Sequence, residues 1–251
     1  MTDELGAMCD EFHVSCRLFL KLDLNPERET VLHFFDRFRK PYPRLRKLRR
    51  TGKEALVLEE DAEEGASRRW IRLDRASLRF GEYAPSDLAS FQQFGELVVE
   101  QAPFHLSLND LDYDHIEVVH GFDLEYRGNH DQLVAETLLG ELGAAGFLFG
   151  DNVIHVIDAQ PYFGIALSPE CDLQASVEVK SRTTTFEVRS ATYEGQPIGV
   201  YLTVRKYWGL DDDVAPVETF DELCALGRTL AMEKVVPHFV NPLAAAIASR
   251  S

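Results

Sequence analysis

The segment from residue 12 to residue 24 alternates between apolar and polar positions along almost its whole length. Every even position in it is apolar, namely Phe12, Val14, Cys16, Leu18, Leu20, Leu22 and Leu24. Because successive side chains of a strand point to opposite faces, this pattern indicates a long strand with one buried and one solvated face. Sheets of such strands are typically antiparallel and need helices on one face only. The predicted fold class is therefore α+β, a mostly antiparallel sheet with helices on one face.

The same alternation returns 104 residues later, between residues 116 and 126. In both copies an asparagine, Asn25 or Asn129, stands where it would cap a following helix. This recurrence predicts an internal duplication of a strand–helix–strand–strand unit, with pseudo-repeats at about residues 12–104 and 112–249. Identity between the two copies is slight, so chance similarity of two strand–helix junctions is the alternative.

Helices are expected where apolar residues recur with the helical period and where capping residues or prolines mark an end. The expected helices are one after Asn25 and Pro26 with the apolar stripe Val31, Phe34, Phe35 and Phe38, a short basic one at residues 44–50, one opened by Pro85, one from Asn129 to about Leu142, a C-terminal one that begins with the capping box Thr219 and Glu222 and ends at Pro237, and a short final one from Asn241.

Further strands are expected where β-branched and aromatic residues gather between turn signals. They are residues 55–58, a hairpin of residues 70–73 and 77–83, and residues 153–158, 162–167, 173–180, 184–193 and 198–208, with acidic turns at 59–65 and 211–213. No Pro- or Ser-rich linker divides the chain, so residues 1–251 are expected to form a single α+β unit.

Composition limits the cellular setting of the protein. No stretch approaches the ~20 apolar residues that span a bilayer, and the acidic N-terminus lacks the pattern of a signal peptide. The four cysteines are scattered without a C-x-x-C pair, which is typical of reduced thiols. These features predict a cytoplasmic protein with no membrane contact.

Charge is distributed very unevenly along the chain. The net charge is −16, yet residues 37–53 carry nine Lys or Arg and no carboxylate. A cationic stretch on an anionic chain suggests contact with phosphate or with an acidic protein surface. The candidate partner- or phosphate-binding residues are Arg39, Lys40, Arg44, Arg46, Lys47, Arg49 and Arg50, which Arg68, Arg69 and Arg72 would extend. The alternative is a solvated face that balances the acidic half of the chain.

No motif assigns a catalytic residue, a metal ligand or a cofactor. His120 occupies an apolar position of its strand and is expected to be a core histidine with a hydrogen-bond partner. His115 lies on the opposite face of the same strand, so the two imidazoles cannot bind one metal ion. Asp110, Asp112 and Asp114 imitate the start of a calcium loop, but its glycine and distal glutamate are missing.

Three stretches resemble a known family in layout: RLDRASLRFGEYA at residues 72–84, VYLTVRKYWG at 200–209, and TFDELCALGRTLAMEKVVPHFVNPLAAAI at 219–247. They are similar to a sporadically distributed bacterial family of uncharacterised proteins of about this length. The resemblance implies a bacterial, cytosolic origin and a single α+β unit. It brings no activity and no functional residue.

Three functions fit these observations. The first is a non-catalytic binding or adaptor protein, a subunit of a homo- or hetero-oligomer that associates through its segregated charges; salt would weaken such an assembly. The second is contact with phosphate or nucleic acid through residues 37–53. The third is a small-molecule site or enzyme, with a pocket between the sheet of the second half and the C-terminal helix lined by Tyr162, Phe163, Tyr201 and Trp208.

Overall fold

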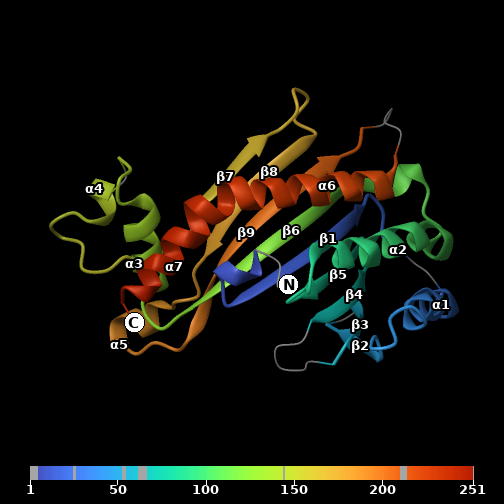
Figure 1. Ribbon diagram of the computed structural model, residues 1–251, viewed down its shortest axis with the longest axis horizontal. Helices are drawn as coiled ribbons and strands as arrows, with labels where there is room; N and C mark the ends of the chain where they lie inside the picture. The colour runs from blue at the N-terminus through green and yellow to red at the C-terminus, as the bar shows by residue number, and fades with distance from the viewer. Residues whose placement is uncertain are drawn as a thin grey trace.

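The computed structural model describes residues 5–24, 27–52, 55–61, 67–143, 145–209 and 214–250. In these ranges nine strands form one sheet in the order β2-β3-β4-β5-β1-β6-β9-β8-β7 (Figure 1). The strands are β1 Glu11–Leu20, β2 Lys47–Thr51, β3 Ala55–Glu59, β4 Arg68–Asp74, β5 Ser77–Tyr83, β6 Tyr113–Tyr126, β7 Tyr162–Ala166, β8 Leu173–Lys180 and β9 Gln196–Tyr207. Every neighbouring pair is antiparallel, which confirms the predicted α+β class.

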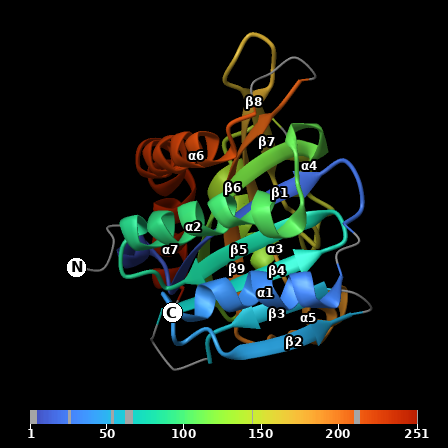
Figure 2. The same ribbon diagram turned by 90° about the vertical axis from the view of Figure 1, so that its right-hand side faces the viewer.

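The helices of the described residues connect and follow these strands. They are α1 Arg28–Arg39, α2 Leu88–Leu106, α3 His130–Val134, α4 Ala145–Leu148, α5 Thr185–Ser190, α6 Pro216–Leu230 and α7 Asn241–Ala248, with π-helical turns η3 Ala135–Leu139 and η4 Ala231–Val240 and 3₁₀ turns η1 Gly6–Met8 and η2 Asp110–Asp112. Helix α6 packs on β6 and β9, and α2 packs on β5 and on α6. In the view of Figure 2, α2, α6 and α7 lie together to one side of the strands. We call the face under α2 and α6 the covered face, and the opposite one the open face.

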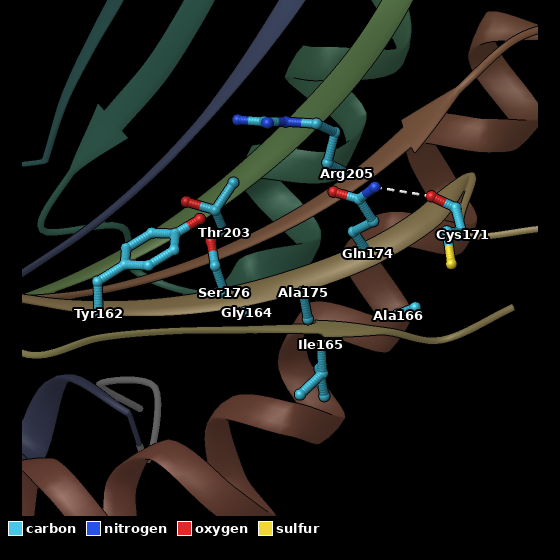
Figure 3. A pocket seen from close by; sticks show the side chains of 10 residues that line it. All are labelled: Tyr162, Gly164, Ile165, Ala166, Cys171, Gln174, Ala175, Ser176, Thr203 and Arg205. Carbon is cyan, nitrogen blue, oxygen red and sulfur yellow. Dashed lines mark hydrogen bonds between the residues drawn. The ribbon is translucent and has the colours of Figure 1, made fainter.

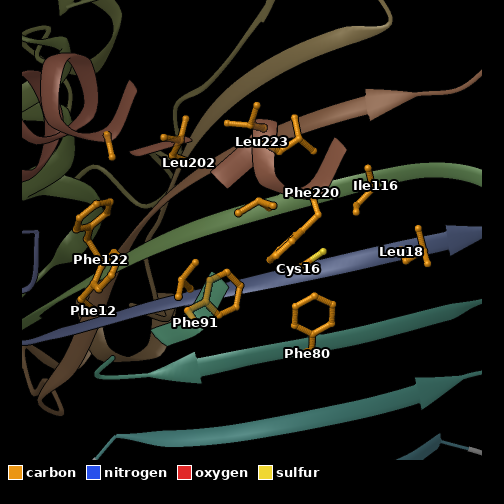
Figure 4. Close-up of a cluster of buried hydrophobic side chains, with 14 of the residues drawn as sticks. Phe12, Cys16, Leu18, Phe80, Phe91, Ile116, Phe122, Leu202, Phe220 and Leu223 are labelled. Carbon is orange, nitrogen blue, oxygen red and sulfur yellow. The ribbon is translucent and has the colours of Figure 1, made fainter. Parts of the chain in front are cut away.

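The core fills the space between the covered face and the helices. Val14, Cys16 and Leu18 of β1 are at most 1% exposed, as the alternation predicts. Phe80 of β5 meets Phe220 of α6 with ring centroids 5.6 Å apart, and Phe91 of α2 also contacts both rings (Figure 4). These contacts hold α2 and α6 against the central strands.

The strand order repeats itself about the β1–β6 pair. Outward from β1 come β5, β4 and β3, and outward from β6 come β9, β8 and β7. The strand that pairs with β1 leads into α2, just as the strand that pairs with β6 leads into α6. This correspondence is what the proposed repeats would produce, and the duplication itself stays a prediction.

Two expected elements have the wrong type. Residues 44–50, expected as a basic helix, instead contribute the edge strand β2, which pairs with β3. Gly52, at φ +63°, supplies the left-handed conformation that a tight turn needs after β2. Residues 184–193, expected as a strand, contain α5. Thr184 and Glu187 form a capping box there, and each side chain bonds the other's backbone N–H.

Two other expectations place an element incorrectly. Residues 153–158 form no strand, because Gln132 Oε1 accepts the backbone N–H of Val156 while Asp131 Oδ1 accepts that of Ala159. The C-terminal helix begins at Pro216, so Thr219 is not its cap, and it passes through Pro237. Its bonding there is π-helical, a pattern that accommodates the missing N–H of proline in mid-helix.

The helix after Asn129 is confirmed in part. The Asn129 side chain accepts from the backbone N–H of Gln132, as a cap does, but the α-helix ends at Val134 and continues as η3. The predicted cap Asn25 with Pro26, the last basic residue Lys53, and the acidic turn at 211–213 lie outside the described residues.

Candidate functional site

The predicted basic segment does not form a single cationic patch. Arg39 and Arg46 are used within the segment: Arg39 Nη2 donates to the carbonyl of Arg46 at 3.3 Å, and Arg46 Nε donates to that of Pro43 at 2.6 Å. Arg39 also lies 3.8 Å from Asp36. Arg44 donates to the carbonyl of Ser67. These guanidinium groups therefore hold the connection between α1 and β2 in place.

The rest of the segment is divided between two places. Lys40 lines a hollow of about 560 Å³ between α1 and α2, beside His33 and His105. Lys47 and Arg49 lie on β2 and share Glu59, with Arg49 in a two-bond pair at 2.6 and 3.1 Å. Arg50 is exposed on the same strand. The structure thus joins Arg39 with Arg46 and places Lys47, Arg49 and Arg50 together on β2. Lys40 lies apart from both groups, in the hollow between α1 and α2.

A different set of arginines lies side by side on neighbouring strands of the open face. The register aligns Arg72 of β4 with Arg79 of β5, and Arg79 with Arg17 of β1. In the next two strands, Glu117 of β6 pairs with Arg17, and Arg205 of β9 pairs with Glu117. We call Arg72, Arg79 and Arg17 the arginine row. Like charges directly opposite each other on neighbouring strands are destabilising, so this alignment has a cost.

The outer arginines of this alignment have carboxylate partners. Arg72 forms two hydrogen bonds with Asp74, at 2.8 and 2.7 Å. Arg205 Nε donates to Glu117 at 3.0 Å. Their charges are therefore largely compensated by the protein itself.

The central arginines lack such partners in the described part of the chain. The Arg17 guanidinium lies 3.8 Å from the Phe19 ring, and its buried Nε has no hydrogen-bond partner. Burial, followed by the nearby charge of Arg79, lowers the pKa of Arg17 from its usual value. Arg79 makes no hydrogen bond or ion pair with any described residue. Arg79 therefore has no partner among the described residues, and Arg17 has the charges of Glu117 and Asp74 nearby but no hydrogen-bond partner at its buried Nε.

Aromatic rings lie flat on the same face, beside the arginine row. The Trp70 indole covers Gly81, where a Cβ atom would come within 2.7 Å of Cζ2. The His13 ring covers Gly121 in the same way, at 2.2 Å. Only glycine leaves room for a ring at these two positions. Burial lowers the pKa of His13, which favours an uncharged imidazole.

Two hollows that are lined by described residues open on this face. One, of about 460 Å³, lies over β2 to β5, and we call it the cationic hollow; Lys47, Arg49, Thr51, Val57, Glu59, Arg68, Trp70, Arg72, Arg79 and Tyr83 line it. Five of these ten residues are Lys or Arg and one is Glu. The other, of about 240 Å³, lies over β7 to β9 with Arg205 at one side (Figure 3).

The histidines and aromatic residues named from the sequence do not form a site. His120 is 1% exposed and burial lowers its pKa to about 4, so it is a core histidine, but its Nδ1 lacks the expected partner within the described residues. His115 stacks on Phe19 on the opposite face, with ring centroids 3.9 Å apart. In the ranges that the structure covers, no group of three His, Cys, Asp or Glu could hold a metal ion.

The predicted pocket lining is also separated by the sheet. Tyr162 and Tyr201 belong to the open face, whereas Phe163 belongs to the covered face and lies 6.2 Å from the Phe239 ring. Trp208 packs edge-on against Tyr113. The four residues therefore cannot line one pocket between the sheet and the C-terminal helix.

Sequence reasoning missed Arg17, Arg79 and Trp70. Each occupies a solvated position of an alternating strand, where charged residues are common. The signal that connects the arginines is the strand register, which aligns residues 17, 72 and 79 and cannot be read from one strand alone. The same register places Trp70 opposite Gly81. Arg72 was predicted from the sequence to extend the basic segment.

The architecture defines a class of protein: a single nine-stranded antiparallel α+β sheet with one helical face and one arginine- and aromatic-bearing face. A scan against protein-family models finds no match, and a search of curated proteins finds no similar sequence. The resemblance to a sporadic bacterial family therefore stays a prediction. None of the described helices is long and apolar enough to cross a membrane.

Proposed function

We propose that this protein works by binding rather than catalysis, as a subunit of an assembly in which a second copy of the chain pairs with strand β7. One observation carries the proposal: β7 is an edge strand, and all five of its residues are exposed. Tyr162, Phe163 and Ile165 are 64%, 49% and 55% exposed. Free N–H and C=O groups on an apolar edge are a template for another strand.

The opposite edge of the sheet provides the contrast. Strand β2 carries Lys47, Arg49 and Arg50, and charged side chains on an edge prevent further pairing. Strand β7, with the sequence YFGIA, has no charge and no proline. The basic residues of β2 would thus protect one edge of the sheet against pairing. Because β7 lacks such charges, association is directed to the β7 edge.

Strand β7 is also complementary to itself. In an antiparallel pair centred on Gly164, Phe163 of one copy would face Ile165 of the other, an aromatic–β-branched pair that stabilises sheets. Such a contact closes as a two-fold dimer. The chain that leads to β7 adds further exposed apolar side chains, which are Leu142, Phe147, Phe149, Val153, Ile154 and Ile157.

Sedimentation velocity over a range of protein concentrations tests this proposal. We expect a dimer that persists as NaCl is raised, because apolar and backbone contacts are not screened. Ile165→Lys should give a monomer, whereas the control Leu22→Lys, at another exposed leucine, should not. A wild-type chain that stays monomeric, or a dimer unaffected by Ile165→Lys, would contradict it. Dissociation by moderate salt would instead favour association through the segregated charges.

A cytoplasmic location belongs to the same proposal. All four cysteines are free, and burial raises the pKa of the Cys9 thiol to about 12. Unpaired thiols are typical of proteins in a reducing compartment.

A further inference from the structure

We infer that the cationic hollow on the open face binds a nucleoside phosphate, with the phosphate on Arg79 and the base on Trp70. This site lies across the sheet from β7, near the other edge, and does not depend on self-association. The chemistry is shared by a free nucleotide and by a nucleotide of a single-stranded nucleic acid, and the experiment below separates these sources.

Positive charge exceeds negative charge in the cationic hollow. The cationic hollow has five Lys or Arg side chains against Glu59, and Glu59 is already shared by Lys47 and Arg49. Arg79 therefore faces the hollow with no partner among the described residues, between Arg72 and Arg17 in the neighbouring strands. An anion placed there would relieve the repulsion between these guanidinium groups. Guanidinium forks match phosphate oxygens in geometry as well as in charge.

Aromatic side chains line the hollow beside these cations. Trp70 stands two residues from Arg72 on the same strand and face, so their Cα atoms are about 7 Å apart. Its indole lies against Gly81, and the half-buried side chain also lines the cationic hollow, where a planar group could stack on it. Tyr83 lines the hollow as well, with the Arg68 guanidinium 4.6 Å from its ring. Aromatic and guanidinium planes are the groups on which unpaired bases stack.

The size of the hollow suits a small ligand. A hollow of about 460 Å³ falls within the range of ~300–1,000 Å³ typical of small-ligand sites. A phosphate ion alone would leave Trp70 and Tyr83 unused. A nucleoside phosphate uses both the cations and the rings, which is why we prefer it to inorganic phosphate or an acidic peptide.

Calorimetric titration of the full chain with ADP, pyrophosphate, adenosine and an eight-residue oligo(dT) tests the inference. At low salt we expect ADP to bind more tightly than pyrophosphate or adenosine. Arg79→Gln should weaken ADP binding roughly tenfold or more, the value of a lost charge-assisted hydrogen bond. The matched control Arg189→Gln, at an exposed arginine on α5, should leave it unchanged.

Fluorescence provides a second readout that does not rely on a charge variant. The chain has two tryptophans, and Trp208 is 7% exposed in the core. In the Trp208→Phe variant, Trp70 is the only tryptophan, and stacking of a base should quench it. Trp70→Leu should weaken ADP binding while leaving pyrophosphate binding unchanged.

The possible results separate the alternatives. Tighter binding of the oligonucleotide than of ADP would identify a strand as the source of the nucleotide, and the reverse order a free nucleotide. Equal affinities for ADP and pyrophosphate without quenching would refute the role of the rings. Absence of binding to both ADP and the oligonucleotide would overturn the inference as a whole.

Discussion

His120 shows at the residue scale how burial sets a chemical property. The side chain lies between β6 and α6, where a Cβ atom on Gly227 would come within 2.5 Å of its Cε1. Burial, followed by the nearby charge of His13, lowers its pKa from 6.5 to about 4. The ring is therefore neutral in the folded protein at neutral pH.

This pKa shift predicts a pH dependence of stability. Below pH 6.5 the unfolded chain protonates His120, whereas the folded protein does so only near pH 4. The unfolded state then binds more protons, so the free energy of unfolding should fall as the pH drops from 6.5 to 4, by roughly 3 kcal/mol at most for this group. Urea unfolding at several pH values measures it.

The control for this prediction is a surface histidine. His120→Gln should flatten the slope of unfolding free energy against pH, even if the variant is less stable overall. His238→Gln, at an exposed position on η4, should retain the wild-type slope. Equal slopes in the two variants would be inconsistent with the proposed role of burial.

At the scale of elements, the two edges of the sheet have opposite chemistry. Strand β2 has a charged edge in a segment that was predicted from the sequence to be a helix. The prediction failed because Arg and Lys favour helices intrinsically, while pairing with β3 and the turn at Gly52 decide the outcome. Packing and pairing with neighbouring strands stabilise β2 by more than the intrinsic helix preference of Arg and Lys, which is only a few tenths of a kcal/mol per residue.

Removal of positive charges from β2 should make the protein more prone to aggregation. In the double variant Lys47→Thr/Arg50→Thr, β2 keeps its strand propensity but loses two charges that keep other strands away. We expect light scattering to rise on heating at a lower temperature than for the wild type. The double variant Arg127→Thr/Arg189→Thr, which removes two charges away from this edge, controls for the change in net charge. Equal onset temperatures in the two double variants would argue against edge protection.

At the scale of the whole molecule, the excess of negative charge opposes compactness. The chain carries 42 Asp and Glu against 26 Lys and Arg. Because self-repulsion destabilises a compact, highly charged state, screening should stabilise it. We expect the midpoint of thermal unfolding to rise as NaCl increases from about 0.01 to 0.15 M, over which the Debye length falls from about 30 to 8 Å.

Calorimetric melting of the wild-type protein in this salt series measures the effect. Sodium sulfate is unsuitable here, since it also strengthens apolar burial. A midpoint that is constant or decreases with NaCl would show that local ion pairs, such as Arg205 with Glu117, outweigh the global repulsion.

Much of the architecture could be predicted from local patterns. The alternation in β1 and β6, the hairpin of β4 and β5, and the apolar stripe of α1 all reflect periodicities that a single element imposes on its own sequence. These patterns were sufficient for the α+β class and for the covered face. They were insufficient at α5 and around Pro237, where the capping box and π-helical bonding were misinterpreted.

The sequence by itself determined which side of an alternating strand such as β1 is buried, because burial of apolar side chains depends there on parity within one element. Only the tertiary structure decided which strands distant in the chain are neighbours, and with them the arginine row and the unprotected edge at β7. Strand register is a relation between distant segments, as between Arg17 and Arg79, and hydrogen bonding across 62 residues leaves no local periodicity in the chain. The candidate surfaces of this protein are properties of that register.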